Sequence, residues 1–403
     1  MLRIDLTRAE PGMSLALPVR DPTRADRVLL KVGFELDRLM LERLREMGVR
    51  SVWIQYPSLE SLGKYVDEAI LASQGALVRE ITQAFAGMQK ESTANLDYGQ
   101  YCQTIGHLVR DLVSNPTAAM FMGDLMEAGE PGDDLLRHAS SVAYLSVLMG
   151  LKLEGYLVRQ RKHIDPARAK EVSNLGLGAM LHDIGVTQLA PEVRAHRLAT
   201  GDETDPAWRE HTALGYRMVR GKVEPSAATC VLNHHQRYDG TGYTGKGMPL
   251  LAGERIHVFA RIVGLADTFD RLRYPLGQPP QPTVWALRTL LDSPVRRQFD
   301  PQSLRALFAV TPPYPPGVML RLSDGRHAVT VNHHVTDPCR PLVQPVPGPE
   351  DLAALRPTDD EPIDLRESAH DLHVIECDGV AVAEYNFDPP ALLRDCSSVR
   401  AWF

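Results

Sequence analysis

From about Leu62 to Leu290, apolar residues recur every three to four positions and strand-like runs are few. This spacing places apolar side chains on one face of successive helices, so the largest part of the 403-residue chain is predicted to be all-α. Prolines between positions 275 and 282, and the run TPPYPPG that begins at Thr311, interrupt the pattern. Because proline does not continue a helix, these segments are expected to be connections.

Shorter patterns flank the helical region. Strands are predicted for the alternating segments around Pro11-Gly12 and for the strand-like SVWIQY. A helix that ends at Gly48 is predicted between them, in the amphipathic run LDRLMLERLREMG. After Pro316, VMLRL, the turn SDG and HAVTV predict a β-hairpin. We therefore expect a mainly α protein with four parts: a small α+β domain over 1–62, a helical linker region over 63–120, an all-helical bundle over 121–312, and a β-rich extension with an acidic linker over 313–403.

Composition narrows the functional class. The net charge of -7 argues against binding a nucleic acid polymer, which needs a basic surface. The five cysteines are scattered and never spaced as C-x-x-C, which fits neither a disulfide framework nor a zinc ribbon. No segment approaches the run of about 20 apolar residues that spans a bilayer, and the N-terminus lacks a signal-peptide core. We expect a cytoplasmic protein.

Histidine and aspartate are concentrated in the predicted bundle, at Asp134, His138, His182, Asp183, His211, His234, His235 and Asp267. One histidine on an apolar face is more often a hydrogen-bonded core residue than a metal ligand. Burying several imidazoles and carboxylates without a cation would, however, be costly. Imidazole with carboxylate suits divalent ions such as Fe, Mn, Ni or Zn, so the set predicts a metal cluster.

The charge of such a cluster indicates its substrate. Two divalent ions bring about four positive charges against three carboxylates, which leaves the site slightly positive and suited to a phosphodiester or phosphate. The adjacent pair His182-Asp183 suggests that one carboxylate bridges two ions that together activate a water. Hydrolysis is the reaction that this arrangement predicts.

Three segments carry a family resemblance. LHDIG (181–185) and HHQRYDGTGYTG (234–245), followed by RIVGLADTFD, closely resemble the HD-GYP family of cyclic di-GMP phosphodiesterases. The resemblance covers roughly residues 120 to 300, and the two ends resemble the small domain and the β extension that flank this module in many bacterial members. It implies an HD-type bundle and hydrolysis of cyclic di-GMP to linear pGpG, with GMP as a second candidate product, in bacterial second-messenger signalling.

Matched position by position, the resemblance implies seven metal ligands: His138, His182, Asp183, His211, His234, His235 and Asp267. Asp183 would bridge two ions and, with His182, serve catalysis, while Asp134 falls where members with a third metal place a glutamate. The implied cofactors are two or three divalent ions, Fe or Mn first and Ni, Zn or Mg as alternatives. The implied signature loop contains Asp239, Gly240, Gly242 and Tyr243.

The chain departs from the family at several positions. Val186 replaces the lysine that normally follows HDIG and contacts the substrate phosphate, and valine cannot donate a charge-assisted bond to a phosphoryl oxygen. Gln236 replaces a glutamate, and Thr244 replaces the proline of the Gly-Tyr-Pro signature. The candidate substrate contacts are Arg271, Arg273 and Tyr243, with exposed salt bridges as an equal alternative for the arginines.

The leading hypothesis is a cyclic di-GMP phosphodiesterase. Val186 keeps a second hypothesis open, a degenerate receptor or scaffold that binds metal or dinucleotide without efficient turnover. Thr244 and the shortened loop after Asp270 keep a third open, an HD phosphohydrolase for another nucleotide. The expected partners are the cyclic dinucleotide, a diguanylate cyclase (GGDEF) or other signalling protein at the signature loop, and a second copy of the chain.

Overall fold

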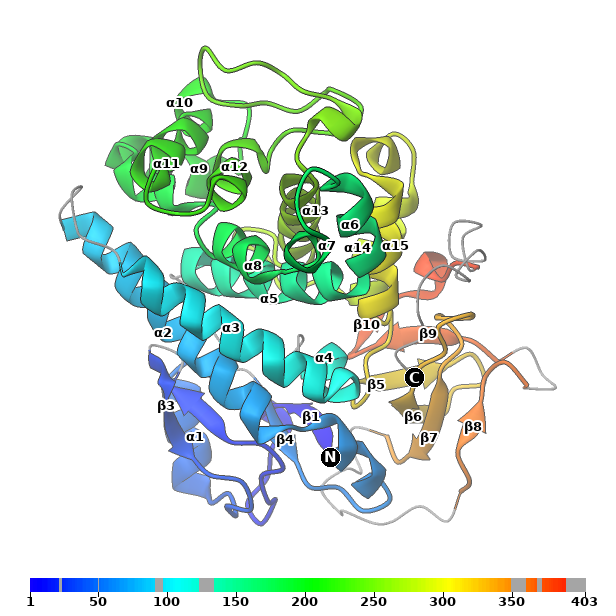
Figure 1. Cartoon of the computed structure of the whole chain (residues 1–403). Helices are drawn as coiled ribbons and strands as arrows, with labels where there is room; N and C mark the ends of the chain where they lie inside the picture. Colours follow the sequence, from blue (N-terminus) through cyan, green and yellow to red (C-terminus); the bar gives the residue numbers. More distant parts are fainter. Residues whose placement is uncertain are drawn as a thin grey trace.

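The computed structural model describes residues 1–21, 24–49, 51–90, 97–122, 134–348, 360–367 and 372–388. Helices fill the middle of the chain, and the strands lie in its first and last parts (Figure 1). In this view the N-terminal part lies below the helical bundle, with two long helices crossing between them, and the C-terminal part lies at the lower right, below the last helices of the bundle. The predicted mainly α architecture with a small α+β unit and a β extension is confirmed.

The N-terminal unit has two small antiparallel sheets and one helix. It contains β1 (Leu2–Asp5) paired with β4 (Ser51–Ile54), β2 (Val19–Asp21) paired with β3 (Arg24–Leu30), α1 (Arg38–Glu46), and the 3-10 turns η1 (Leu6–Arg8) and η2 (Glu60–Tyr65). Asp37 caps α1 by accepting a hydrogen bond from the Met40 amide at 2.7 Å. Gly48 follows α1 at φ 81°, so the predicted glycine at the helix end is confirmed.

Two long helices connect this unit to the bundle. They are α2 (Glu68–Lys90) and α3 (Tyr98–Ser114), which pack side by side and lead into α4 (Pro116–Met122) (Figure 1). One face of α3 carries the buried residues Ile105, Leu108 and Leu112, at the spacing expected for an amphipathic helix. The helices predicted between residues 63 and 120 are therefore present.

The bundle consists of short helices around two long ones. They are α5 (Asp134–Lys152), α6 (Glu154–Gln160), α7 (Pro166–Ala169), α8 (Ser173–Met180), η4 (Ile184–Gln188), α9 (Pro191–Thr200), α10 (Pro206–Arg209), α11 (His211–Val219), α12 (Pro225–Asn233), η5 (Gly253–Arg255), α13 (Val258–Arg273), α14 (Thr283–Leu291), η6 (Val295–Gln298) and α15 (Pro301–Val310). Several begin with an acidic cap followed by proline, whose missing N–H costs nothing at that position. The central helix α13 is buried along most of its length and packs on α5, α8 and α12.

The C-terminal part forms one antiparallel sheet in the order β10-β9-β5-β6-β7-β8. Its strands are β5 (Met319–Leu322), β6 (His327–Asn332), β7 (Leu342–Val346), β8 (Ile363–Asp364), β9 (Val374–Cys377) and β10 (Val380–Ala381), followed by η8 (Ala383–Tyr385). The predicted hairpin is β5-β6, whose turn holds Gly325 at φ 90°. The segment expected to be an acidic linker contains β8, which pairs with β7, so its described part is not all linker.

The two ends of the chain contact each other closely. A Cβ on Gly317 would lie 2.4 Å from the Trp53 ring, so only glycine fits between the C-terminal part and β4. Tyr65 donates to Asn332 Oδ1 at 3.0 Å, which links η2 to the end of β6. A single continuous set of buried apolar residues extends from Met1 to Phe387. The parts therefore share a core.

Within the described ranges, no single helix has both the length and the apolar composition needed to cross a membrane. The helices α5 and α6 pass that test only when taken together, and they are bent by 84° relative to each other.

Candidate metal centre

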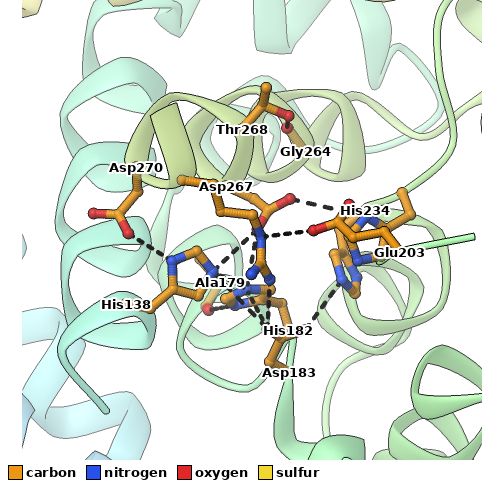
Figure 2. Close-up of polar contacts among 12 residues, drawn as sticks. His138, Ala179, His182, Asp183, Glu203, His234, Gly264, Asp267, Thr268 and Asp270 are labelled. Atoms are coloured by element: carbon orange, nitrogen blue, oxygen red, sulfur yellow. Dashed lines mark hydrogen bonds and ion pairs between the residues drawn. The ribbon is translucent and has the colours of Figure 1, made fainter. Parts of the chain in front are cut away.

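Seven of the predicted ligands meet at the centre of the bundle, where Figure 2 shows His138, His182, Asp183, His234 and Asp267 facing one another. They come from α5, the turn after α8, the first residue of α11, the end of α12 and the middle of α13. All seven are at most 4% exposed. They form two groups whose ligand atoms lie within 4.8 Å of one another: Asp183, His211, His234 and His235 in the first, and His138, His182 and Asp267 in the second.

Backbone carbonyls orient three of the imidazoles. His182 Nδ1 donates to the Ala179 oxygen at 2.7 Å, and His211 Nδ1 donates to the Trp208 oxygen at 2.7 Å. His234 Nδ1 donates to the Val231 oxygen at 3.0 Å. A carbonyl can only accept, so each Nδ1 carries the proton and each Nε2 presents a lone pair to the cluster. Sequence reasoning found the histidines but not these carbonyl partners, which only the local backbone path reveals.

A carboxylate orients the fourth imidazole. His138 Nδ1 lies 2.6 Å from Asp270 Oδ2, and Arg137 holds both Asp270 oxygens at 3.0 and 3.1 Å. Burial would raise the pKa of Asp270, but the Arg137 guanidinium keeps that pKa well below its usual value. Sequence reasoning missed Asp270 and Arg137. The Asp-x-x-Asp spacing from Asp267 was a usable signal, because residues three apart lie on one side of a helix.

The protonation states suit metal ligands. Burial lowers the pKa of both His182 and His211 to about 4, so these imidazoles are neutral near pH 7. Burial opposes ionisation of Asp183, but its neighbours, His182 foremost, hold the pKa of that carboxyl well below its usual value. Burial and Arg271 lower the pKa of His138, and the hydrogen bonds with Asp267 and Asp270 outweigh them and raise it. The cluster therefore joins ionised carboxylates to mostly neutral imidazoles.

The first group contains buried polar atoms that have no hydrogen-bond partner among the described residues: Asp183 Oδ1, His211 Nε2, His234 Nε2 and both ring nitrogens of His235. Asp183 Oδ1 lies 3.4 Å from the Nε2 atoms of His211 and His234. Since those nitrogens present lone pairs, atoms of like partial charge face one another, and a cation between them would remove the repulsion. Three imidazole nitrogens and a carboxylate oxygen are a donor set that fits a divalent transition metal.

Comparison with known proteins agrees with this geometry, since residues 156–302 match the family model described as HD domain. The chain contains an HD domain. It is 28% identical over 331 residues to the cyclic di-GMP phosphodiesterase PA4108 of Pseudomonas aeruginosa, covering 75% of each protein. It is 31% identical over 144 residues to the cyclic di-GMP phosphodiesterase response regulator RpfG of Xanthomonas campestris pv. campestris, covering 34% of this chain and 36% of that relative.

A solved structure is also similar: Bd1817, a HDG"Y"P protein from Bdellovibrio bacteriovorus, aligns with 76% of this chain and 97% of its own at a TM-score of 0.44 and 19% identity. The resemblance that the LHDIG and HHQRYDGTGYTG segments predict is confirmed at the level of the HD family. The matched range begins after His138 and lies inside the predicted 121–312 boundaries, which stay a prediction.

Three glycines bring backbone segments of the HD domain close to the ligand histidines. A Cβ on Gly185 would lie 2.0 Å from the His211 oxygen, one on Gly264 2.2 Å from the His234 oxygen, and one on Gly242 2.4 Å from the His235 oxygen. No side chain can be placed at such distances, so these contacts require glycine. Gly185 and Gly242 stand in recognised motifs. Gly264 had a weaker signal, a glycine in the middle of a predicted helix.

The signature loop is tied to the ligands. Asp239 Oδ1 accepts from the Thr241 amide at 3.0 Å, Gly240 has φ 84°, and the Tyr243 amide donates to the His235 oxygen at 3.1 Å. The Tyr243 ring stacks on His235 with centroids 4.5 Å apart. The loop predicted at the rim of the site therefore packs directly on His235, one of the candidate ligands.

The candidate substrate contacts are placed differently from one another. Arg271 donates from Nη2 to Asp183 Oδ2 at 2.9 Å and from Nε to Asp267 Oδ1 at 2.7 Å, with its side chain 24% exposed. Arg273 donates to Thr283 and, at 3.3 Å, to the Tyr274 hydroxyl. Val186 is buried in a small apolar cluster.

One predicted ligand lies outside this description. Asp134 is the first residue of α5, but its side chain is not among those that the structure describes. A third metal position at Asp134 stays a prediction from the family resemblance.

Proposed function

We propose that this chain is a metal-dependent phosphodiesterase that hydrolyses cyclic di-GMP to linear pGpG, with GMP as a second product, in bacterial second-messenger signalling. The observation that carries the proposal is the buried set of seven imidazoles and carboxylates, whose first group holds ligand atoms without hydrogen-bond partners among the described residues. The similar proteins PA4108 and RpfG, both named cyclic di-GMP phosphodiesterases, support the substrate.

Two divalent ions would occupy the two groups, with Fe or Mn as the proposed metals and Ni, Zn or Mg as alternatives. Asp183 would help to hold both ions, since its Oδ1 faces the first group and its Oδ2 lies 3.5 Å from His182 Nε2 in the second. When bound, such ions act as Lewis acids that lower the pKa of a water and offset charge on phosphoryl oxygens. The proposed catalytic residues are Asp183 and His182.

The chain's own residues prepare this site for an anion. The carbonyl partners fix the imidazole tautomers before any ligand arrives, so no reorientation is needed. The ionised pair Arg137 and Asp270 fixes the His138 ring. Arg271 can present a guanidinium to a phosphoryl oxygen, and Arg271 and Tyr243 both remain proposed substrate contacts.

Turnover and metal content of anaerobically purified protein test the proposal. Native protein is expected to contain divalent metal and to hydrolyse cyclic di-GMP, and Asp183→Ala is expected to lose both because it removes the bridging carboxylate. Arg288→Ala is the control, since it removes an exposed arginine of α14 that pairs with Asp292 and contacts none of the candidate ligands in the ion pairs of the described residues. Metal-loaded native protein without turnover would contradict the proposal.

One observation favours a second candidate function, a receptor that binds metal or dinucleotide without efficient turnover. Val186 packs with Leu189 and Trp208, so residue 186 offers no cationic donor at the sequence position where the family has its lysine. Val186→Lys separates the two functions. Gained turnover in a previously inactive protein would indicate a receptor, and a change in rate alone would make Val186 a tuning residue. Other cyclic dinucleotides and nucleoside phosphates in the same assay address a different nucleotide substrate.

Location and partners complete the proposal. We place the protein in the cytoplasm, a location supported by the four cysteines in the described ranges, which are all free thiols. A diguanylate cyclase or another signalling protein at the signature loop, and a second copy of this chain, remain proposed partners.

A further inference from the structure

Arg271 contacts the two carboxylates that belong to different metal groups. Its Nη2 donates to Asp183 Oδ2 at 2.9 Å, and its Nε donates to Asp267 Oδ1 at 2.7 Å. Guanidinium remains protonated at any physiological pH, so this is a permanent positive charge at the carboxylates.

The two groups differ in how many of their candidate ligand atoms already have hydrogen-bond partners in the protein. In the first group, Asp183 Oδ1 and the nitrogens that face it have no hydrogen-bond partner among the described residues. In the second group, Asp267 Oδ1 already accepts a hydrogen bond from Arg271 and lies 3.0 Å from His138 Nε2. His138 Nε2 is in turn 3.2 Å from His182 Nε2. A divalent ion entering the second group must displace contacts that an ion entering the first does not meet.

Arg271 has an acceptor outside the cluster. Glu203 Oε1 lies 3.7 Å from its Nε, and the Glu203 side chain is 33% exposed and is also held by Arg197. The Arg271 side chain is itself 24% exposed, so it has room to turn toward Glu203. The guanidinium can therefore leave the carboxylates without losing every anionic partner.

We infer that Arg271 is an internal cation that competes with a divalent ion for the second group. It makes the position formed by His138, His182 and Asp267 the weaker of the two metal positions, and so sets how many ions the protein holds. The inference rests on the proposed metal-dependent function. It concerns the affinity of one position, which can be measured without turnover.

Calorimetric titration of the metal-free full chain with Mn²⁺ tests the inference directly. Native protein is expected to show one tight step and a second step with a Kd at least roughly tenfold weaker, because a fixed charge about 4 Å from an incoming ion raises its energy. Arg271→Met keeps much of the apolar stem and removes the charge, so it should strengthen the second step at least roughly tenfold. Arg271→Lys should retain a weak second step, and Arg288→Ala should match native protein.

Thermal unfolding without metal supplies a second readout. With EDTA present, Arg271→Met is expected to unfold at a lower temperature than native protein, because Asp183 and Asp267 lose their guanidinium partner. Excess Mn²⁺ should remove this difference. An equal unfolding temperature in EDTA for native protein and this variant would contradict the role of Arg271 as the balancing charge.

The outcomes separate this inference from the proposed function. Two equally tight Mn²⁺ steps in both native protein and Arg271→Met would overturn the competition and leave the metal centre intact. Failure of both proteins to bind any Mn²⁺ would overturn the metal centre and the inference together. If Arg271→Met does not fold, Arg271→Lys decides, since native-like steps for lysine support a role of charge and two tight steps for lysine contradict it.

Discussion

Replacing Gly185 by alanine tests how the fold positions a ligand. The added Cβ would lie 2.0 Å from the His211 oxygen and 2.5 Å from the Gly215 amide nitrogen, both of them backbone atoms. Ordinary carbon contacts need about 3.5 Å, so η4 and α11 must separate by roughly 1 Å or more. Metal–ligand distances tolerate only about 0.2 Å, so His211 would leave its position opposite Asp183. We expect metal affinity to fall by roughly 10 to 100-fold and unfolding free energy to fall by about 1–3 kcal/mol.

Mn²⁺ titration and urea unfolding of the metal-free protein measure these two effects. Gly106→Ala is the control, because Gly106 lies in α3 and its added Cβ would meet nothing within 4 Å. That change should leave metal binding unaltered and stability equal or slightly higher, since alanine favours a helix. Native affinity and native stability in Gly185→Ala would refute the argument that this close backbone approach holds His211 in place.

Three further changes test the structure around the centre. Asp300→Ala should lower the free energy of unfolding, measured in urea, by about 3–5 kcal/mol. The reason is that buried Arg261, whose Nη1 lies 2.7 Å from Asp300 Oδ2, would lose its carboxylate partner. An effect below about 1 kcal/mol would contradict this. Burial lowers the pKa of His257 to about 4, so this residue should contribute up to about 3 kcal/mol to the loss of native stability as the pH drops from 6.5 to 4. His257→Asn should therefore show a flatter profile than native protein in the same pH series of urea unfolding. Asp270→Ala should weaken Mn²⁺ binding roughly 10 to 100-fold by freeing the His138 ring, and unchanged titration curves would exclude that role.

The helices and the ligand set were predictable because both leave periodic or local signals. Apolar spacing located the bundle, and the LHDIG and NHH segments located four of the candidate ligands within short motifs. The resemblance placed His138 and Asp267, and the structure brings them together across 129 positions of sequence. The sequence does not show how the chain runs in three dimensions between these motifs. That path decides which side chains become hydrogen-bond and ion-pair partners.

The missed residues illustrate this limit. Asp270 carried a spacing signal, but its partner Arg137 lies on α5, and only tertiary packing joins them. Arg271 was predicted to contact phosphate or to form an exposed salt bridge. The structure pairs it with the buried carboxylates of Asp183 and Asp267, so its salt bridges are not exposed ones, and the phosphate contact stays a prediction. The strand β8 lies within an acidic, proline-containing segment, and its pairing with β7 is what makes it a strand.

The contact of Gly317 with Trp53 bears on how proteins of this kind are rearranged during evolution. Recombination exchanges domains freely only when each keeps its own core, because a transplanted domain must fold without its former neighbours. Here the first and last parts of the chain meet through a glycine that admits no side chain, and buried apolar residues run without a break from one part to the next. A substituted N-terminal unit would have to arrive together with a matching C-terminal sheet, so the two ends are expected to be inherited as a pair.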